Sequence, residues 1–255
     1  MFTHAIVRPP GSNFKNGLTT VHLGVPDYRL AQEQHQAYCA ALESCGIKLI
    51  RLPSDERFPD STFVEDNAII TPRGSIFTAP GAASRKGEIA TVHETVVKFS
   101  SQTFQIEAPG TLDGGDVVNA DGHYFIGISH RTNEAGAQQL SAILTRLGYS
   151  SAIINIRDQP ILHLSTGMAS LGDNRLTLIK SLAPEPCLQG YQLITTVDGE
   201  EYAANCLRVN DNVILAAGFR AFEKAIQKLG FQVVAVPMSE FSKQDGGLTC
   251  LSLRF

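Results

Sequence analysis

Residues 113–148 read DGGDVVNADGHYFIGISHRTNEAGAQQLSAILTRLG, and this stretch decides the fold. Residues 117–128 predict a β-hairpin that turns at Asp121-Gly122, since Asp-Gly between two strand-like runs favours a tight turn. Residues 133–147 carry apolar side chains at helical spacing, and Gly148 follows as a helix stop. The stretch therefore predicts one hairpin followed by one helix.

The same order of elements recurs elsewhere in the chain. Residues 64–79 predict a hairpin around Pro72-Arg73-Gly74, and a helix follows at about 87–98. Residues 206–216 predict another hairpin, which turns at Asn210-Asp211 and leads into a helix at about 219–229. Three hairpin-and-helix units are therefore predicted.

Two further units are less regular. A weaker hairpin covers residues 163–179 and turns at Gly172-Asp173-Asn174. Residues 26–45 have the periodicity of a helix with Gly46 as its stop, and residues 47–52 follow as a strand. The strand predicted at 245–255 could pair with residues 4–7 and so close a fifth unit.

The three clear units also share details of sequence. Each hairpin begins with polar or acidic residues: Glu65-Asp66-Asn67, Asp113-Gly114-Gly115-Asp116 and Ala203-Ala204-Asn205-Cys206. Between each hairpin and its helix, an arginine precedes a glutamate by three residues: Arg85 and Glu88, Arg131 and Glu134, Arg220 and Glu223.

Five units of about 40–50 residues are typical of a propeller-like repeat protein. Because hairpins alternate with helices, the predicted fold class is α/β, as a five-bladed α/β propeller. No low-complexity linker or charge block divides residues 1–255, so we expect a single domain. An ordinary α+β sheet with coincidental spacing is the alternative.

Composition excludes several classes of protein. The content of 43% hydrophobic and 18% charged residues is that of a globular protein. A net charge of −4 gives no basic surface for nucleic acid or anionic membrane, and no run is long enough for a membrane span. No signal peptide is visible, and five scattered cysteines favour free thiols in the cytoplasm. The chain has no Cys-x-x-Cys or His-Glu-x-x-His motif, so we expect no metal.

Cys250 follows a glycine turn in the run Lys243-Gln244-Asp245-Gly246-Gly247-Leu248-Thr249-Cys250. At the start of a strand its thiolate could attack a small bound electrophile. A lone cysteine is more often a buried structural residue. In a closed ring, however, the starts of the strands converge on the axis, which would bring Asp66, Asp113 and His163 beside it.

Such a set has a recognisable chemistry. His163 lies within an apolar run, where it could be a core residue or could protonate a leaving amine and later activate water. Several carboxylates could bind a guanidinium through paired hydrogen bonds, although turn or loop positions are the alternative reading. Arg85 and Arg131 could bind a carboxylate, or could pair with their own glutamates on the surface. A ligand that carries a guanidinium at one end and a carboxylate at the other is arginine-like.

In these residues the chain resembles the dimethylarginine dimethylaminohydrolases, which are guanidino-modifying enzymes of the pentein fold. The matching segments run from one end of the chain to the other: Gly17-Leu18-Thr19-Thr20, His22-Leu23-Gly24, residues 55–61, Phe63-Val64-Glu65-Asp66, residues 107–111, Arg131-Thr132-Asn133, residues 202–206 and residues 245–250. Each motif is weak alone, and their order makes the match specific.

The resemblance implies roles for ten residues. Cys250 matches the nucleophile, His163 the general acid and base, and Asp66 the carboxylate that binds the guanidinium. Residues that match further substrate contacts are Leu18, Asp60, Glu65, Arg85, Arg131 and, through its backbone carbonyl, Gln244. Asp113 falls where some members have glutamate, which leaves open whether it contacts His163, the substrate or both.

The activity implied is hydrolysis of dimethyl- and monomethylarginine to citrulline, with loss of dimethylamine or methylamine through a covalent thiouronium, and without a cofactor. An arginine deiminase or amidinotransferase on the same fold is the first alternative, although the chain is short for either. A non-catalytic binding module is the second. The expected partner is a small-molecule substrate, and the oligomeric state stays open, with a homodimer as one option.

Overall fold

The hairpin and helix predicted between residues 113 and 148 are both present. Strands β6 (Val117–Ala120) and β7 (His123–Ile128) pair antiparallel. Asp121 and Gly122 at their turn both have positive φ angles, of 53° and 92°, as a two-residue turn of this hand requires. Helix α3 (Glu134–Arg146) begins after Asn133, whose side chain accepts a hydrogen bond from the amide of Gly136.

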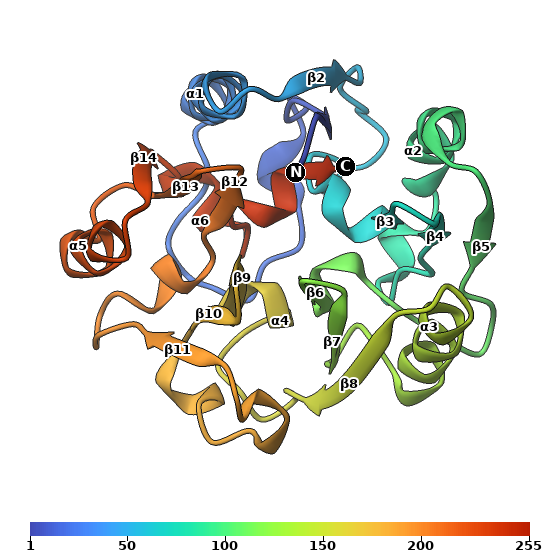
Figure 1. Cartoon of the computed structure of the whole chain (residues 1–255). Coiled ribbons are helices and arrows are strands. Elements are labelled where there is room, and N and C mark those ends of the chain that lie inside the picture. The colour runs from blue at the N-terminus through green and yellow to red at the C-terminus, as the bar shows by residue number, and fades with distance from the viewer.

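The helix leads to a third strand that the sequence did not reveal. Strand β8 (Ser150–Asn155) lies parallel to β7, so the unit is a hairpin, a crossover helix and an added parallel strand. The computed structural model describes all 255 residues and arranges five such sheets around one axis (Figure 1). The predicted five-bladed α/β propeller is therefore confirmed.

Every sheet has the same internal order. The inner strands are β15 (Ser252–Arg254), β3 (Ala68–Thr71), β6, β9 (Met168–Gly172) and β12 (Leu207–Val209). Each runs antiparallel to a middle strand: β1 (His4–Val7), β4 (Gly74–Phe77), β7, β10 (Arg175–Leu178) or β13 (Asn212–Ala216). The outer strands are parallel to the middle ones: β2 (Lys48–Arg51), β5 (Thr103–Gln105), β8, β11 (Gln192–Thr195) and β14 (Gln232–Val236).

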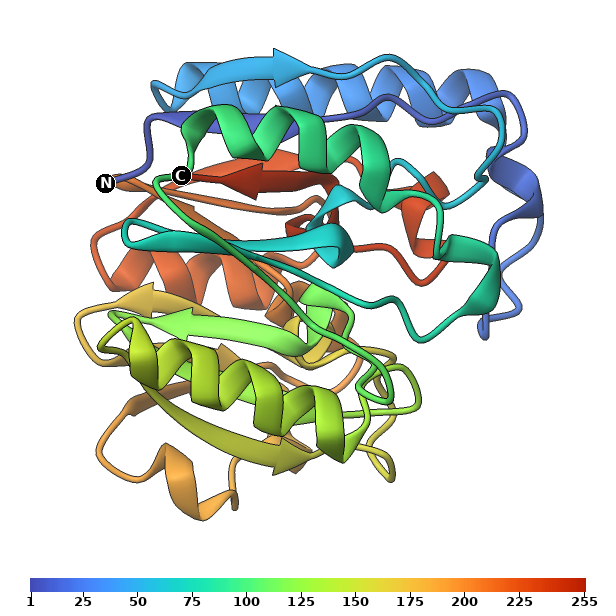
Figure 2. The same ribbon diagram turned by 90° about the vertical axis from the view of Figure 1, so that its right-hand side faces the viewer.

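Four long helices connect middle to outer strands and lie on the outside of the ring (Figures 1 and 2). They are α1 (Tyr28–Ser44), α2 (Ile89–Val96), α3 and α5 (Arg220–Lys228). In the fourth sheet two short 3₁₀ turns, Lys180–Leu182 and Pro186–Leu188, take the place of a helix. Helices α4 (Leu164–Gly167) and α6 (Ser239–Ser242) are single turns. No helix in the structure is both long enough and apolar enough to cross a membrane.

The two ends of the chain close the ring. Strand β15 pairs with β1, as the sequence predicted, and Leu253 lies opposite Ile6. The pairing fixes the residues just before β15, and Cys250 among them, at the centre of the molecule.

The repeated spacing of arginine and glutamate has different outcomes in the three units. Arg85 and Glu88 form a buried ion pair of 2.7 Å. Glu134 instead pairs with Arg157, which leaves Arg131 free of it. No ion pair joins Arg220 to Glu223. The spacing therefore marks the start of a helix, and it marks an ion pair in only one case.

Candidate active site

Five short helical turns meet at the axis, one before each inner strand. They are the segments Val64–Asn67, Gly114–Asp116, Leu164–Gly167 (α4), Glu201–Ala204 and Thr249–Leu251. Because each turn comes directly before a strand that lines the axis, residues far apart in the sequence are brought together. Cys250 lies within the last turn, where the sequence had predicted the mouth of a strand.

The turns surround a small pocket, with about 330 Å³ of empty space when the open solvent at its mouth is included. Eight of the ten residues expected from the sequence line it: Leu18, Asp60, Asp66, Arg85, Arg131, His163, Gln244 and Cys250. Phe63, Leu162, Asp245 and Gly246 complete the wall. The other two expected residues, Asp113 and Glu65, are not on its wall.

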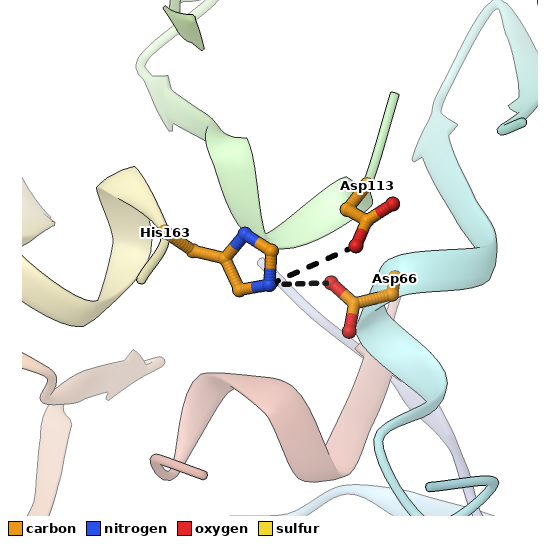
Figure 3. Close-up of side chains that lie close together, drawn as sticks. All are labelled: Asp66, Asp113 and His163. Carbon is orange, nitrogen blue, oxygen red and sulfur yellow. Dashed lines mark ion pairs between the residues drawn. The ribbon is translucent and has the colours of Figure 1, made fainter. Parts of the chain in front are cut away.

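His163 faces three carboxylates. Its Nε2 lies 3.9 Å from Asp66 Oδ1 and 3.9 Å from Asp113 Oδ2. The three side chains come from the segments that precede three different inner strands (Figure 3). His163 Nδ1 lies 3.3 Å from Asp116 Oδ2 on the other side of the ring. Burial alone would lower the pKa of His163, but the charges of Asp116, Asp66 and Asp113 raise it to about 10. The imidazole is therefore protonated at neutral pH.

Asp116 is a residue of this site that the sequence reasoning did not select. Its Oδ2 accepts hydrogen bonds of 2.6 Å from the hydroxyls of Ser129 and Thr132, and its Oδ1 accepts one of 3.1 Å from the amide of Leu164. It therefore fixes the segment that begins at His163, and its Oδ2 lies beside the imidazole. The signal available was its place in the DGGD motif, where a turn position was the alternative to a place in the site.

Asp66 is held by a buried arginine. Arg85 donates to Asp66 Oδ2 at 2.5 Å, and the amide of Gly115 donates to Asp66 Oδ1 at 2.9 Å. Arg85 also donates to Glu88 and to the carbonyls of Asp60 and Phe63. Burial would raise the pKa of Asp66, but Arg85 and His163 hold it below its ordinary value. Arg85 thus keeps Asp66 ionised and oriented.

Two glycines allow these groups to approach each other. A Cβ on Gly114 would lie 2.0 Å from the carbonyl oxygen of Glu65, and one on Gly115 would lie 2.9 Å from Asp66 Oδ1 and 3.0 Å from His163 Cγ. Any side chain at either position would separate the turns that carry the site.

Asp113 is fully buried, and only one of its two carboxylate oxygens has a hydrogen-bond partner. Its Oδ1 accepts a hydrogen bond of 2.8 Å from the amide of Gly81, while its Oδ2, the oxygen near His163, has no hydrogen-bond partner. Burial and the charge of Asp66 raise the pKa of Asp113. A buried carboxylate oxygen without a partner is costly, so this oxygen is suited to accept from a bound ligand.

Cys250 is 4% exposed and has one polar neighbour of note. The amide of Gly247 donates to its Sγ at 3.5 Å. Burial and the nearby carboxylates of Glu65 and Asp66 raise the pKa of the thiol. In the empty pocket the sulfur is therefore a thiol at neutral pH.

The opposite end of the pocket carries groups suited to an amino acid. Asp60 accepts from the amide of Leu18 at 3.0 Å, and burial raises the pKa of its carboxyl. Arg131 lines the pocket, and its guanidinium forms no hydrogen bond or ion pair with the protein. Gln244 is buried, with no partner for its side-chain oxygen.

Glu65 departs from the expectation. Its carboxylate accepts from Thr249 Oγ1 at 2.8 Å and lies 3.5 Å from Arg254 Nη2, so it lines a second, larger cavity at the other end of the axis. The neighbours in sequence Glu65 and Asp66 face different cavities, as do Thr249 and Cys250. Glu65 therefore acts near the sulfur only through its charge, and the structure gives it no place on the pocket wall.

Asp66, Asp113 and His163 could also be considered as metal ligands. One atom from each lies within 4.8 Å of the others. A metal would require the neutral imidazole, whereas the raised pKa keeps His163 protonated.

Comparison with known proteins agrees with this chemistry. The family model for N,N dimethylarginine dimethylhydrolase, eukaryotic, matches residues 27–185. The N(G),N(G)-dimethylarginine dimethylaminohydrolase of Pseudomonas aeruginosa is 45% identical over 100% of both chains. The protein of the same name from Streptomyces coelicolor is 34% identical over 98% of this chain and 96% of its own.

Solved structures agree as well. A cysteine-to-serine mutant of the Pseudomonas aeruginosa protein, complexed with citrulline, has a TM-score of 0.97 and 44% identity, with both chains fully covered. The N-terminal domain of ArgZ, an arginine dihydrolase of cyanobacteria, has a TM-score of 0.87 at 18% identity, over 100% of this chain and 97% of that one. The second likeness concerns the fold alone.

Proposed function

Because this chain belongs to the dimethylarginine dimethylaminohydrolase family, we propose that it hydrolyses N-methylated L-arginine to L-citrulline and a methylated amine, with Cys250 as nucleophile. The observation that supports this most strongly is a single small pocket lined by Cys250, His163 and Asp66, with the unpaired oxygen of Asp113 beside them.

The guanidinium would bind between the carboxylates. A planar cation can donate two parallel hydrogen bonds to a carboxylate, and Asp66 is held ionised in a fixed orientation by Arg85. The free oxygen of Asp113 supplies a second acceptor. The substrate cation would then offset the negative charge of these buried carboxylates.

The amino-acid end would bind at the mouth of the pocket. The free guanidinium of Arg131 suits the substrate carboxylate, since its five donors match a planar anion. Asp60 and the backbone at Gln244 would accept from the substrate ammonium group. Leu18, whose amide fixes Asp60, covers the site from the exposed segment that follows Gly17.

Substrate binding would also activate the sulfur. The bound cation opposes the negative charge of Glu65 and Asp66, which lowers the pKa of Cys250 from its raised value in the empty pocket. The thiol releases its proton to solvent as substrate binds, and the thiolate attacks the central guanidinium carbon. Protonated His163 transfers its proton to the leaving amine as the carbon–nitrogen bond breaks. A thiouronium on Cys250 remains, and the amine departs.

The second half of the reaction releases the product. His163, now neutral, takes a proton from water, whose oxygen attacks the same carbon. Collapse of the tetrahedral adduct breaks the carbon–sulfur bond, which gives citrulline and returns the sulfur. Asp116 would hold the imidazole in place throughout, because its Oδ2 lies beside Nδ1.

An arginine deiminase is the alternative that the pocket itself leaves open. Citrulline formation from asymmetric dimethylarginine, monomethylarginine and arginine, followed at equal concentrations, distinguishes the two. A pocket shaped for N-methyl groups should favour the methylated substrates by roughly 10–200-fold in kcat/KM for each methyl-sized contact. Equal turnover of arginine would establish the deiminase.

We also propose a cytoplasmic location, which five free cysteines support. A homodimer is a further proposal, which sedimentation of the purified protein would test.

A further inference from the structure

Not all five central turns contribute a residue to the pocket wall. The turn Glu201–Ala204 ends at Asn205, which is 1% exposed and lies directly between two turns that do carry the site. Asn205 is a polar side chain in the middle of the ring, and the mechanism described above does not use it.

The side chain of Asn205 joins the segment of His163 to the segment of Cys250. Its Nδ2 donates to the carbonyl of Ser165 at 2.7 Å and to the hydroxyl of Thr249 at 3.0 Å. Its Oδ1 accepts from the amide of Thr249 at 3.1 Å. Ser165 is two residues from His163, and Thr249 precedes Cys250.

The orientation of this amide is determined by its partners. A carbonyl can only accept and a backbone amide can only donate, so the nitrogen must face Ser165 and the oxygen must face Thr249. With Asn205 donating to its oxygen, the Thr249 hydroxyl donates its own proton to Glu65 Oε2 at 2.8 Å. Every polar atom of the Asn205 side chain is therefore engaged.

A third contact reaches the sulfur. A Cβ on Gly247 would lie 2.5 Å from Asn205 Cγ, so the backbone of Gly247 packs directly on this amide. The amide of Gly247 is the group that donates to Cys250 Sγ. Asn205 therefore supports the glycine turn on one side of the cysteine and Thr249 on the other.

We propose that Asn205 is a positioning residue, which fixes Cys250 Sγ relative to His163 by joining the turns that carry them. The proposal rests on the proposed function in so far as the two residues act on the same substrate carbon. A displacement of the nucleophile by about 1 Å can reduce a rate by about 100-fold. Because Asn205 does not line the pocket, substrate binding should change little.

The test compares Asn205→Ala with the loss of a side-chain hydrogen bond elsewhere in the protein. Asn210→Ala removes a hydrogen bond of 3.0 Å to the carbonyl of Cys45, away from the pocket. We expect Asn205→Ala to lower kcat for dimethylarginine by about 100-fold with KM within about threefold. Asn210→Ala should lower the melting temperature and leave both constants unchanged.

A second readout separates this proposal from the proposed function. The rate at which iodoacetamide alkylates Cys250 is measured against pH by peptide mapping, and it needs no turnover. With the contact from Gly247 weakened, Asn205→Ala should move the midpoint to higher pH, whether or not methylarginine is the substrate.

Thr249 supplies an independent variant if Asn205→Ala does not fold. Thr249→Val removes the hydroxyl that links Asn205 to Glu65, and Thr249→Ser restores it. We expect Val to lower kcat and shift the alkylation profile, and Ser to recover both. The proposal is overturned if kcat of the Asn205 and Thr249 variants stays within threefold of the wild type and their alkylation profiles do not shift. It is also overturned if both quantities change only as much as they do in Asn210→Ala.

Discussion

Replacement of Asp66 by asparagine is the perturbation whose result the structure defines best. The change keeps the shape of the side chain and removes the anion that faces the guanidinium. A hydrogen bond to a charged group contributes about 1.5–3 kcal/mol, so its loss should lower kcat/KM by roughly 10–150-fold. Citrulline formation from dimethylarginine measures the effect.

The geometry around Asp66 adds a cost that the charge alone does not include. Both of its oxygens accept from donors, the amide of Gly115 and the guanidinium of Arg85. In either orientation, the NH₂ group of asparagine would face one of these donors. We therefore expect Asp66→Asn also to destabilise the fold by about 1–3 kcal/mol, measured by denaturant unfolding.

A matched control distinguishes this site from a general effect of charge. Asp198→Asn removes a carboxylate whose side chain is 87% exposed and pairs with Lys180 at the surface. Such pairs contribute about 0–1 kcal/mol, so neither turnover nor stability should change measurably. A kcat/KM for Asp66→Asn within about threefold of the wild type would refute the assignment of Asp66 to the guanidinium.

Three further outcomes are expected. Cys250→Ala should fold and form no citrulline, whereas turnover should persist after the alanine replacement of Cys39, Cys45 or Cys187. Ultraviolet absorbance of the Cys250 thiolate, with Cys250→Ser as blank, should appear at lower pH when a non-reactive amidinium ligand is bound; an unchanged titration would contradict coupling to the cation. The pKa of His163 is about 10 in the folded protein and 6.5 ordinarily, so protonation of His163 stabilises the fold fully below pH 6.5, and this stabilisation is lost towards pH 10. In urea titrations, the wild type should therefore lose stability relative to His163→Gln over that pH range.

Local chemistry made the repeating hairpins predictable. Asp121-Gly122 and Gly148 adopt the positive φ angles that their residue types favour, and Asn133 caps its helix as its side chain allows. Of the outer strands, only β2 was predicted, at residues 47–52, and the other four were missed. Strand β5, for example, is three residues long, and its pairing with β4 is set by tertiary contacts rather than by its own pattern.

The candidate site, too, was only partly predictable from the sequence. Closure of a ring was sufficient to bring Cys250, His163 and Asp66 together, because each stands beside an inner strand. The direction of each side chain was not predictable, since residues adjacent in a turn face opposite cavities. Glu65, which was expected in the pocket, lines the other cavity instead, and Asp116 was overlooked although its carboxylate lies beside His163.

The most direct test of the central claim is to observe the covalent bond to Cys250. His163→Gly should still react with S-methyl-L-thiocitrulline, because methanethiolate departs without a proton from the imidazole, and the adduct should persist because no base activates water. Mass spectrometry of the digested protein should then show one modified peptide, at Cys250, with the mass of the ligand less methanethiol. No adduct, or an adduct on another cysteine, would contradict the mechanism.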